Sequence, residues 1–144
     1  MKPINTAKLD GLRKHNLPID QYAITGSGPL GVRNLRKIGD IDIIVTPGLW
    51  DLLAEKYGII DKNGVKKIVF PGGGIEAFRE GSFYSAEKYA DAPTVADRIT
   101  NAEIIDGLPF ESLDHFLYFK RKMNREKDLE DVRLIEAYLR AHQK

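Results

Sequence analysis

The chain has 144 residues, a length that suits one domain, and its hydrophobic fraction of 42% and charged fraction of 30% are ordinary for a globular protein. It contains no cysteine, which excludes disulfide frameworks and thiolate zinc sites and favours a cytoplasmic location. No apolar run approaches the roughly 20 residues of a membrane span, the first residues lack the apolar segment of a signal peptide, and a formal net charge of +1 does not indicate a nucleic-acid binder.

The predicted elements begin with a helix over residues 5–15 and a strand over residues 21–25 that runs into glycines. The later elements are a short helix at 31–37, a strand at 40–45, a helix from Thr46 or Pro47 to Gly58, strands at 65–70, 74–80 and 97–105, a turn at 106–110, and closing helices at about 111–123 and 128–142. Residues 82–94 are predicted to form a polar loop. This order predicts an α+β fold, a small mixed β-sheet with flanking helices, in a single domain over residues 1–144 closed by a helical pair at about 111–142.

A glycine-rich stretch, Gly-Ser-Gly-Pro-Leu-Gly at residues 26–31, matches the dinucleotide-binding pattern G-x-G-x-x-G. That interpretation needs an acidic residue at the far end of the second strand, where it would bind a ribose hydroxyl. Here Asp40 and Asp42 fall at the start of the strand instead, and they are paired. The rest of the chain does not continue as alternating strands and helices. The dinucleotide-binding interpretation is therefore disfavoured.

The D-x-D sequence of Asp40 and Asp42 indicates a pair of neighbouring carboxylates, because residues i and i+2 of a strand face the same side. Two carboxylates that close repel each other, and a divalent cation relieves the repulsion. Mg²⁺ prefers such oxygen ligands, together with the phosphates of a substrate. Two solvated acids at an exposed strand start are the alternative. The backbone N–H groups around Gly26, Ser27 and Gly28 add a candidate phosphate cradle one strand away.

The segment from Gly26 to Val45, GSGPLGVRNLRKIGDIDIIV, resembles the polymerase-β-like nucleotidyltransferase superfamily. That family's motif is a hydrophobic strand, Gly-Ser or Gly-Gly, a short helix, and a strand that begins D-x-D. The segment KRKMNREKDLEDVRLI, residues 120–135, is similar to the lysine-rich and K-D-x-x-D helical segment of small bacterial nucleotidyltransferases, including the AbiEii/MenT-type toxins. Together these two segments cover about a quarter of the chain. They imply an enzyme that transfers a nucleoside monophosphate from an NTP to a hydroxyl group.

The resemblance also implies roles for particular residues. Asp40 and Asp42 would bind Mg²⁺, with Mn²⁺ as an alternative ion, and Glu76 would complete a second metal site and help to deprotonate the attacking hydroxyl. Many relatives carry Asp at the position of Glu76, and a strand charge beside a glycine turn is the alternative for this residue. The residues implied in nucleotide binding are Gly26, Ser27, Gly28, Arg36, Lys120, Lys127 and Asp128.

Lys120 has independent support from periodicity. Leu113, Phe116 and Leu117 form an apolar stripe, and Lys120 continues it at i+7, so we expect its side chain to face inward and to need an anionic partner. A triphosphate or an acidic side chain would serve. Asp128 is equally explained as an N-cap of the last helix. Arg33, Arg36 and Arg125 are candidates for contact with phosphates or RNA, although most such arginines are simply solvated.

Three function classes remain open from the sequence. The first is the Mg²⁺-dependent nucleotidyltransferase. The second is a nucleotide- or RNA-binding module of the same fold without turnover. The third is a nucleic-acid binder that uses the basic block of residues 120–127. The acceptor is open among tRNA, other RNAs, proteins and small molecules. The resemblance to toxins implies an antitoxin as a possible partner, and no membrane association is expected.

Overall fold

The computed structural model describes residues 3–82 and 90–142, with side chains described from residue 7 onward. Within this part of the chain, one mixed sheet has the strand order β3-β4-β5-β2-β1-β7-β6. The strands are β1 (Tyr22–Gly26), β2 (Ile41–Val45), β3 (Ile60–Lys62), β4 (Val65–Val69), β5 (Ile75–Phe78), β6 (Glu103–Ile105) and β7 (Leu108–Phe110). The predicted α+β class is confirmed.

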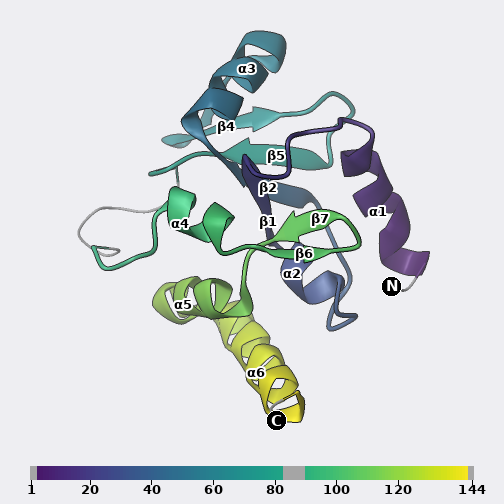
Figure 1. Cartoon of the computed structure of the whole chain (residues 1–144). Helices are drawn as coiled ribbons and strands as arrows, with labels where there is room; N and C mark the ends of the chain where they lie inside the picture. Colours follow the sequence, from purple (N-terminus) through teal and green to yellow (C-terminus); the bar gives the residue numbers. More distant parts are fainter. Residues whose placement is uncertain (1–2, 83–89, 143–144) are drawn as a thin grey trace.

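The helices are α1 (Pro3–Arg13), α2 (Gly28–Gly31), α3 (Pro47–Tyr57), α4 (Val95–Thr100), α5 (Leu113–Met123) and α6 (Glu126–Ala141). The ends of α3 match the prediction, because the Thr46 hydroxyl accepts a hydrogen bond from the Leu49 N–H and Gly58 ends the helix at φ 80°. The α5–α6 pair lies at the end of the molecule away from α3 (Figure 1). No helix in the described ranges is long and apolar enough to cross a membrane.

The centre of the sheet is formed by β1 and β2, which are antiparallel, with β7 parallel to β1 and β5 parallel to β2. Because these strands alternate, one face is apolar. Ile24, Ile43 and Ala77 are register neighbours and fully buried on that face, where Leu9 and Leu12 of α1 and Trp50 of α3 join the same core. The opposite face carries the polar residues described below, and α4 packs on it through Val95 and Ile99 against Ala23 and Ile44.

The strand predicted over residues 97–105 is wrong in its first half. Residues 95–100 form α4, because the Thr94 hydroxyl accepts a hydrogen bond from the Asp97 N–H and Asp97 lies in the first turn. The helix buries Val95, Arg98 and Ile99 against the sheet. The apolar residues that suggested a strand therefore form one face of a short helix.

The helix predicted over residues 31–37 is displaced and shorter. It is the single turn α2, with Pro29 in its first turn as expected, and the chain leaves it through Asn34 at φ 62°. Gly28 and Gly31 are buried. A Cβ on Gly28 would come within 2.3 Å of Ile24 Cγ2, and a Cβ on Gly31 within 2.1 Å of Ile38 Cγ1. The glycines therefore bring this turn against its neighbours more closely than other residues allow.

Two short hairpins complete the edges of the sheet, and two of their strands were not predicted. β3 and β4 are joined by Asn63–Gly64, with φ values of 55° and 83°, while β6 and β7 are joined by Asp106–Gly107, with 51° and 80°. Asn-Gly and Asp-Gly with positive φ are typical of two-residue hairpin turns. These dipeptides were the available signal for β3 and β7.

Candidate active site

The polar face of the sheet has a row of side chains across its central strands. Asp42 on β2 is paired in register with Thr25 on β1 and with Glu76 on β5. Register neighbours project from the same face of a sheet. We call Asp40, Asp42 and Glu76 the carboxylate row. The three carboxylates that the sequence suggested come from two segments that are distant along the chain, and the pairing of β2 with β5 brings Asp42 and Glu76 together.

The alternation of β2 explains the position of Asp42. Ile41 and Ile43 are 1% and 0% exposed on the core face, so Asp42 between them must project to the other side. Asp40 lies one residue before β2 and is exposed, and its charge acts on Asp42. Asp40 and Asp42 therefore lie close enough for their charges to interact.

The electrostatics of the row centre on Asp42. Burial raises the pKa of Asp42, the charges of Glu76 and Asp40 raise it further, and the charges of Lys67 and Lys120 lower it, with a result of about 7. Crowded carboxylate oxygens of this kind form a donor set that suits a hard divalent cation. Among the described residues, no three histidine or carboxylate side chains are preassembled into a metal site. The chemistry of the donors nevertheless fits such an ion.

Gly26 lies directly beside Asp42. It ends β1 at φ 66°, and a Cβ on this residue would lie 2.6 Å from Asp42 Oδ2, closer than such atoms approach. Any other residue would therefore have to displace the carboxylate or the turn. The first glycine of the predicted phosphate loop thus has a structural role in placing Asp42.

Ser27 and Arg36 belong to the connection between β1 and β2. The Ser27 hydroxyl accepts a hydrogen bond from the Gly39 N–H at 3.0 Å, which closes the loop one residue before Asp40. Arg36 is 43% exposed at its side chain and donates to Asp131 Oδ1 at 2.7 Å. Arg36 is therefore linked to α6, and its remaining surface faces solvent.

Lys120 faces inward, as its periodicity predicted. Its side chain is 11% exposed, and its ammonium lies 3.2 Å from Asp128 Oδ1 and 3.0 Å from Asp131 Oδ2. The anionic partner required for this lysine is thus supplied by α6. Because the charge of Lys120 also acts on Asp42, the α5–α6 pair borders the carboxylate row electrostatically.

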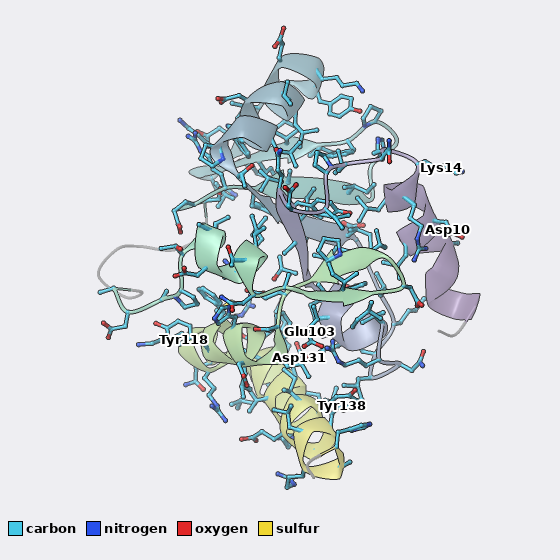
Figure 2. All side chains as sticks on the ribbon, in the orientation of Figure 1. Asp10, Lys14, Glu103, Tyr118, Asp131 and Tyr138 are labelled. Carbon is cyan, nitrogen blue, oxygen red and sulfur yellow. The ribbon has the colours of Figure 1, made fainter. Side chains whose placement is uncertain are left out.

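The N-cap proposed for Asp128 is wrong. Arg125 is the N-cap of α6, and Asp128 lies at the third helical position, where its side chain accepts from the Arg125 backbone N–H at 3.1 Å. Burial raises the pKa of Asp128, but hydrogen bonds from Arg125 and Lys120 outweigh it and lower the pKa to about 2. Asp131 lies near the junction of α5 and α6 (Figure 2). Lys127 is exposed on a shallow surface shared with Glu126, Glu130 and Arg133.

Sequence reasoning missed the charged partners that flank the row. On one side, Lys67 of β4 lies 3.0 Å from Glu76 Oε2. On the other, Thr25 donates to Glu111 Oε1 at 2.7 Å, and buried Arg98 pairs with Glu111, which is 0% exposed. Thr25 and Glu111 are far apart along the chain, so no local signal joins them. Lys67 and Glu76 lie on the consecutive strands predicted at 65–70 and 74–80, which was the available signal for their pairing. Tyr84 and Tyr89 belong to the loop predicted over residues 82–94 and lie outside the described residues.

A scan against protein-family models and a search of curated proteins find no match. Among solved structures, this chain is similar to a protein from Thermotoga maritima that is provisionally named a nucleotidyltransferase. The similarity covers 90% of this chain and 92% of that one, with a TM-score of 0.56 and 16% sequence identity. An identity this low establishes shared architecture rather than shared activity. The chain therefore shares its fold with that protein.

Proposed function

We propose that the protein is a nucleotidyltransferase that moves a nucleoside monophosphate from an NTP to an acceptor hydroxyl and releases pyrophosphate. The observation that carries the proposal is the register pairing of Asp42 with Glu76 on adjacent parallel strands. Gly26 lies beside this pair, and a Cβ on Gly26 would collide with the Asp42 carboxylate. The fold shared with the Thermotoga protein supports it. The repulsion within the carboxylate row is the feature that a metal–triphosphate complex would relieve.

The proposed reaction balances as a single displacement. The acceptor oxygen forms a bond to the α-phosphorus, the bond from the α-phosphorus to the bridging oxygen breaks, and pyrophosphate leaves with that oxygen. The acceptor proton passes to a carboxylate oxygen of Glu76.

Asp40 and Asp42 are the residues that would hold a divalent cation, Mg²⁺ or Mn²⁺, with the Glu76 carboxylate beside them. When bound, that ion would neutralise charge on the phosphates and orient the reacting groups. The chain's own contribution is to fix the acids. β2 and β5 set the spacing of Asp42 and Glu76, and the Ser27–Gly39 hydrogen bond restrains the turn before Asp40.

The triphosphate would contact the turn at Gly26, Ser27 and Gly28, with basic side chains on the α6 side of the row. Arg36, Lys120 and Arg125 contact two buried carboxylates of α6, Asp128 and Asp131. Arg36 and Arg125 retain exposed surface for a phosphate. Asp128 would act by positioning Lys120, and exposed Lys127 would contact the outer part of a bound substrate.

The class of acceptor belongs to the same proposal. The resemblance to AbiEii/MenT-type enzymes favours an RNA hydroxyl as the acceptor, with tRNA as the first candidate and a protein hydroxyl as the second. The same resemblance favours a cytoplasmic site of action and an antitoxin as a partner protein. The basic side chains along α5 and α6 support an RNA acceptor, because phosphate contacts supply most of the affinity in such complexes.

A screen of acceptors tests the proposal. The four NTPs, each labelled at the α-phosphate, are incubated with Mg²⁺ and the protein in the presence of total tRNA, total protein or the chain alone. The native chain is expected to transfer label to one acceptor, and an Asp40→Asn/Asp42→Asn variant is expected to transfer none. Bound NTP without transfer would instead indicate the non-catalytic binding module, and neither binding nor transfer would contradict both.

A further inference from the structure

Lys67 is the cation closest to the carboxylate row that no function yet explains. It lies two residues before Val69, the register partner of Glu76, so it projects from the polar face of the sheet. Its ammonium is 3.0 Å from Glu76 Oε2, and both side chains are largely withdrawn from solvent, at 19% and 22% exposure. The geometry is that of a direct hydrogen-bonded ion pair rather than a chance surface contact.

The charges of the row then divide into two parts. Glu76 is matched by Lys67, while Lys120 on the opposite side is held by Asp128 and Asp131. Asp40 and Asp42 have no ion pair with a lysine or arginine among the described residues. Their two negative charges equal the charge of one divalent cation.

We propose, on the basis of the function proposed above, that Lys67 is a permanent counter-ion of Glu76, so that the site binds one divalent cation through Asp40 and Asp42 rather than two. The Lys67 ammonium supplies to Glu76 the positive charge that a second ion would otherwise provide. Lys67 is thus a positioning residue that holds the Glu76 carboxylate toward β4 and sets the number of metal ions that the protein accepts.

The proposal predicts two separate consequences of removing the lysine. Without metal, Glu76 loses its partner beside Asp42, and the protein becomes less stable. With metal, Glu76 becomes available as a ligand, and the site binds the ion more tightly or accepts a second one. Lys66 offers a matched control, because it lies on the same strand, projects from the other face and is exposed.

The experiment is a Mn²⁺ titration followed by electron paramagnetic resonance, with melting temperatures measured in EDTA and in Mn²⁺. The native chain and Lys66→Met are expected to bind one ion with equal affinity, and Asp40→Asn/Asp42→Asn to bind at least tenfold more weakly. Lys67→Met is expected to bind a second ion, or one ion about tenfold more tightly. It should also melt several degrees lower in EDTA and recover in Mn²⁺.

Two results would overturn the proposal: two ions of similar affinity in the native chain, or identical binding and melting of Lys67→Met and Lys66→Met. If Asp40→Asn/Asp42→Asn binds Mn²⁺ as tightly as the native chain, the proposed metal site is contradicted. The melting temperatures in EDTA still test the pairing of Lys67 with Glu76.

If Lys67→Met does not fold, Lys67→Met/Glu76→Gln removes both charges and is expected to fold and to bind one ion. Failure of that double variant to bind one ion would count against the proposal.

Discussion

Gly26 and Asp42 occupy neighbouring space at the end of β1 and the start of β2. A side chain on Gly26 would meet Asp42 Oδ2 at 2.6 Å, and the backbone there has φ 66°. The residue therefore combines two requirements, for a left-handed backbone and for an absent Cβ. The sequence motif shows only that glycine is present, while the structure shows which atom makes it necessary.

Gly26→Ala is expected to lower nucleotidyl transfer by about 100-fold, because a shift of the Asp42 carboxylate disrupts the alignment of the reacting groups. It should also cost about 1–2 kcal/mol of stability for the left-handed backbone. Gly58→Ala is the matched control, since Gly58 has φ 80° and open space around it. Equal activity of Gly26→Ala and Gly58→Ala would show that the contact with Asp42 does not matter.

Asp42 makes the stability of the metal-free protein depend on pH. Its pKa is about 7 in the folded chain, against an ordinary value of 3.8, so between these values the folded state takes up a proton and the unfolded state does not. The stability that protonated Asp42 contributes is full below about pH 4 and is lost as the pH rises through 7.

Asp42→Asn is therefore expected to flatten the rise in melting temperature of the metal-free protein as the pH is lowered from about 8 to about 4, and to be more stable than the native chain at about pH 8. Melting curves in EDTA across this range measure the effect. An unchanged slope in Asp42→Asn would mean that the carboxylate ionises normally.

At the scale of elements, α5 and α6 are joined by a buried ion cluster. Lys120 contacts Asp128 and Asp131, whose side chains are 0% and 3% exposed. A second link between the same helices, Arg121 with Glu136, is largely exposed. Buried carboxylates that lose a partner are costly, while exposed pairs contribute little.

Lys120→Met is expected to lower the free energy of unfolding by about 3 kcal/mol, because it leaves two buried carboxylates short of a cation. Arg121→Gln is the control and should cost less than about 1 kcal/mol. Urea denaturation of both variants makes the comparison. Similar losses in the free energy of unfolding for both variants would show that burial does not increase the contribution of the cluster to stability.

Several features of the helices and strands could be predicted from local sequence patterns. The period-2 alternation around Asp42, the Thr46 cap of α3 and the apolar stripe that includes Lys120 are local patterns, and each prediction from them is confirmed. The segment of α4 was predicted to be a strand because its residues also suit a strand. The cap at Thr94 makes it a helix instead. Asp128 was placed at the start of its helix rather than inside the first turn, since Arg125 is an unusual N-cap.

Across the whole molecule, the parts that could not be predicted depend on strand order. The pairing of β2 with β5 is what places Glu76 beside Asp42, and the pairing of β4 with β5 is what brings Lys67 to Glu76. The β2–β5 pairing has no signature within a short window of sequence, whereas β4 and β5 follow one another across a short glycine-rich loop. The contact of Lys67 with Glu76 could therefore be expected from a local hairpin, while the placement of Glu76 beside Asp42 emerges only from the assembled sheet.

The buried pair of Arg98 and Glu111 joins α4 to the segment that follows β7, and Thr25 ties the pair to β1. Arg98→Met is expected to cost about 3–5 kcal/mol, because Glu111 would remain buried without a cation. Arg98→Met/Glu111→Leu should recover much of that loss. Urea denaturation tests both, and a double variant no more stable than Arg98→Met would contradict the electrostatic origin of the loss.

The most direct test of the central claim compares one NTP labelled at the α-phosphate with the same NTP labelled at the γ-phosphate, using the native chain and Asp42→Asn with the acceptor found in the screen. The account predicts that α-label is transferred, that γ-label is released as pyrophosphate, and that Asp42→Asn does neither. Transfer of the γ-label, or transfer of the α-label that survives in Asp42→Asn, would contradict nucleotidyl transfer at the carboxylate row.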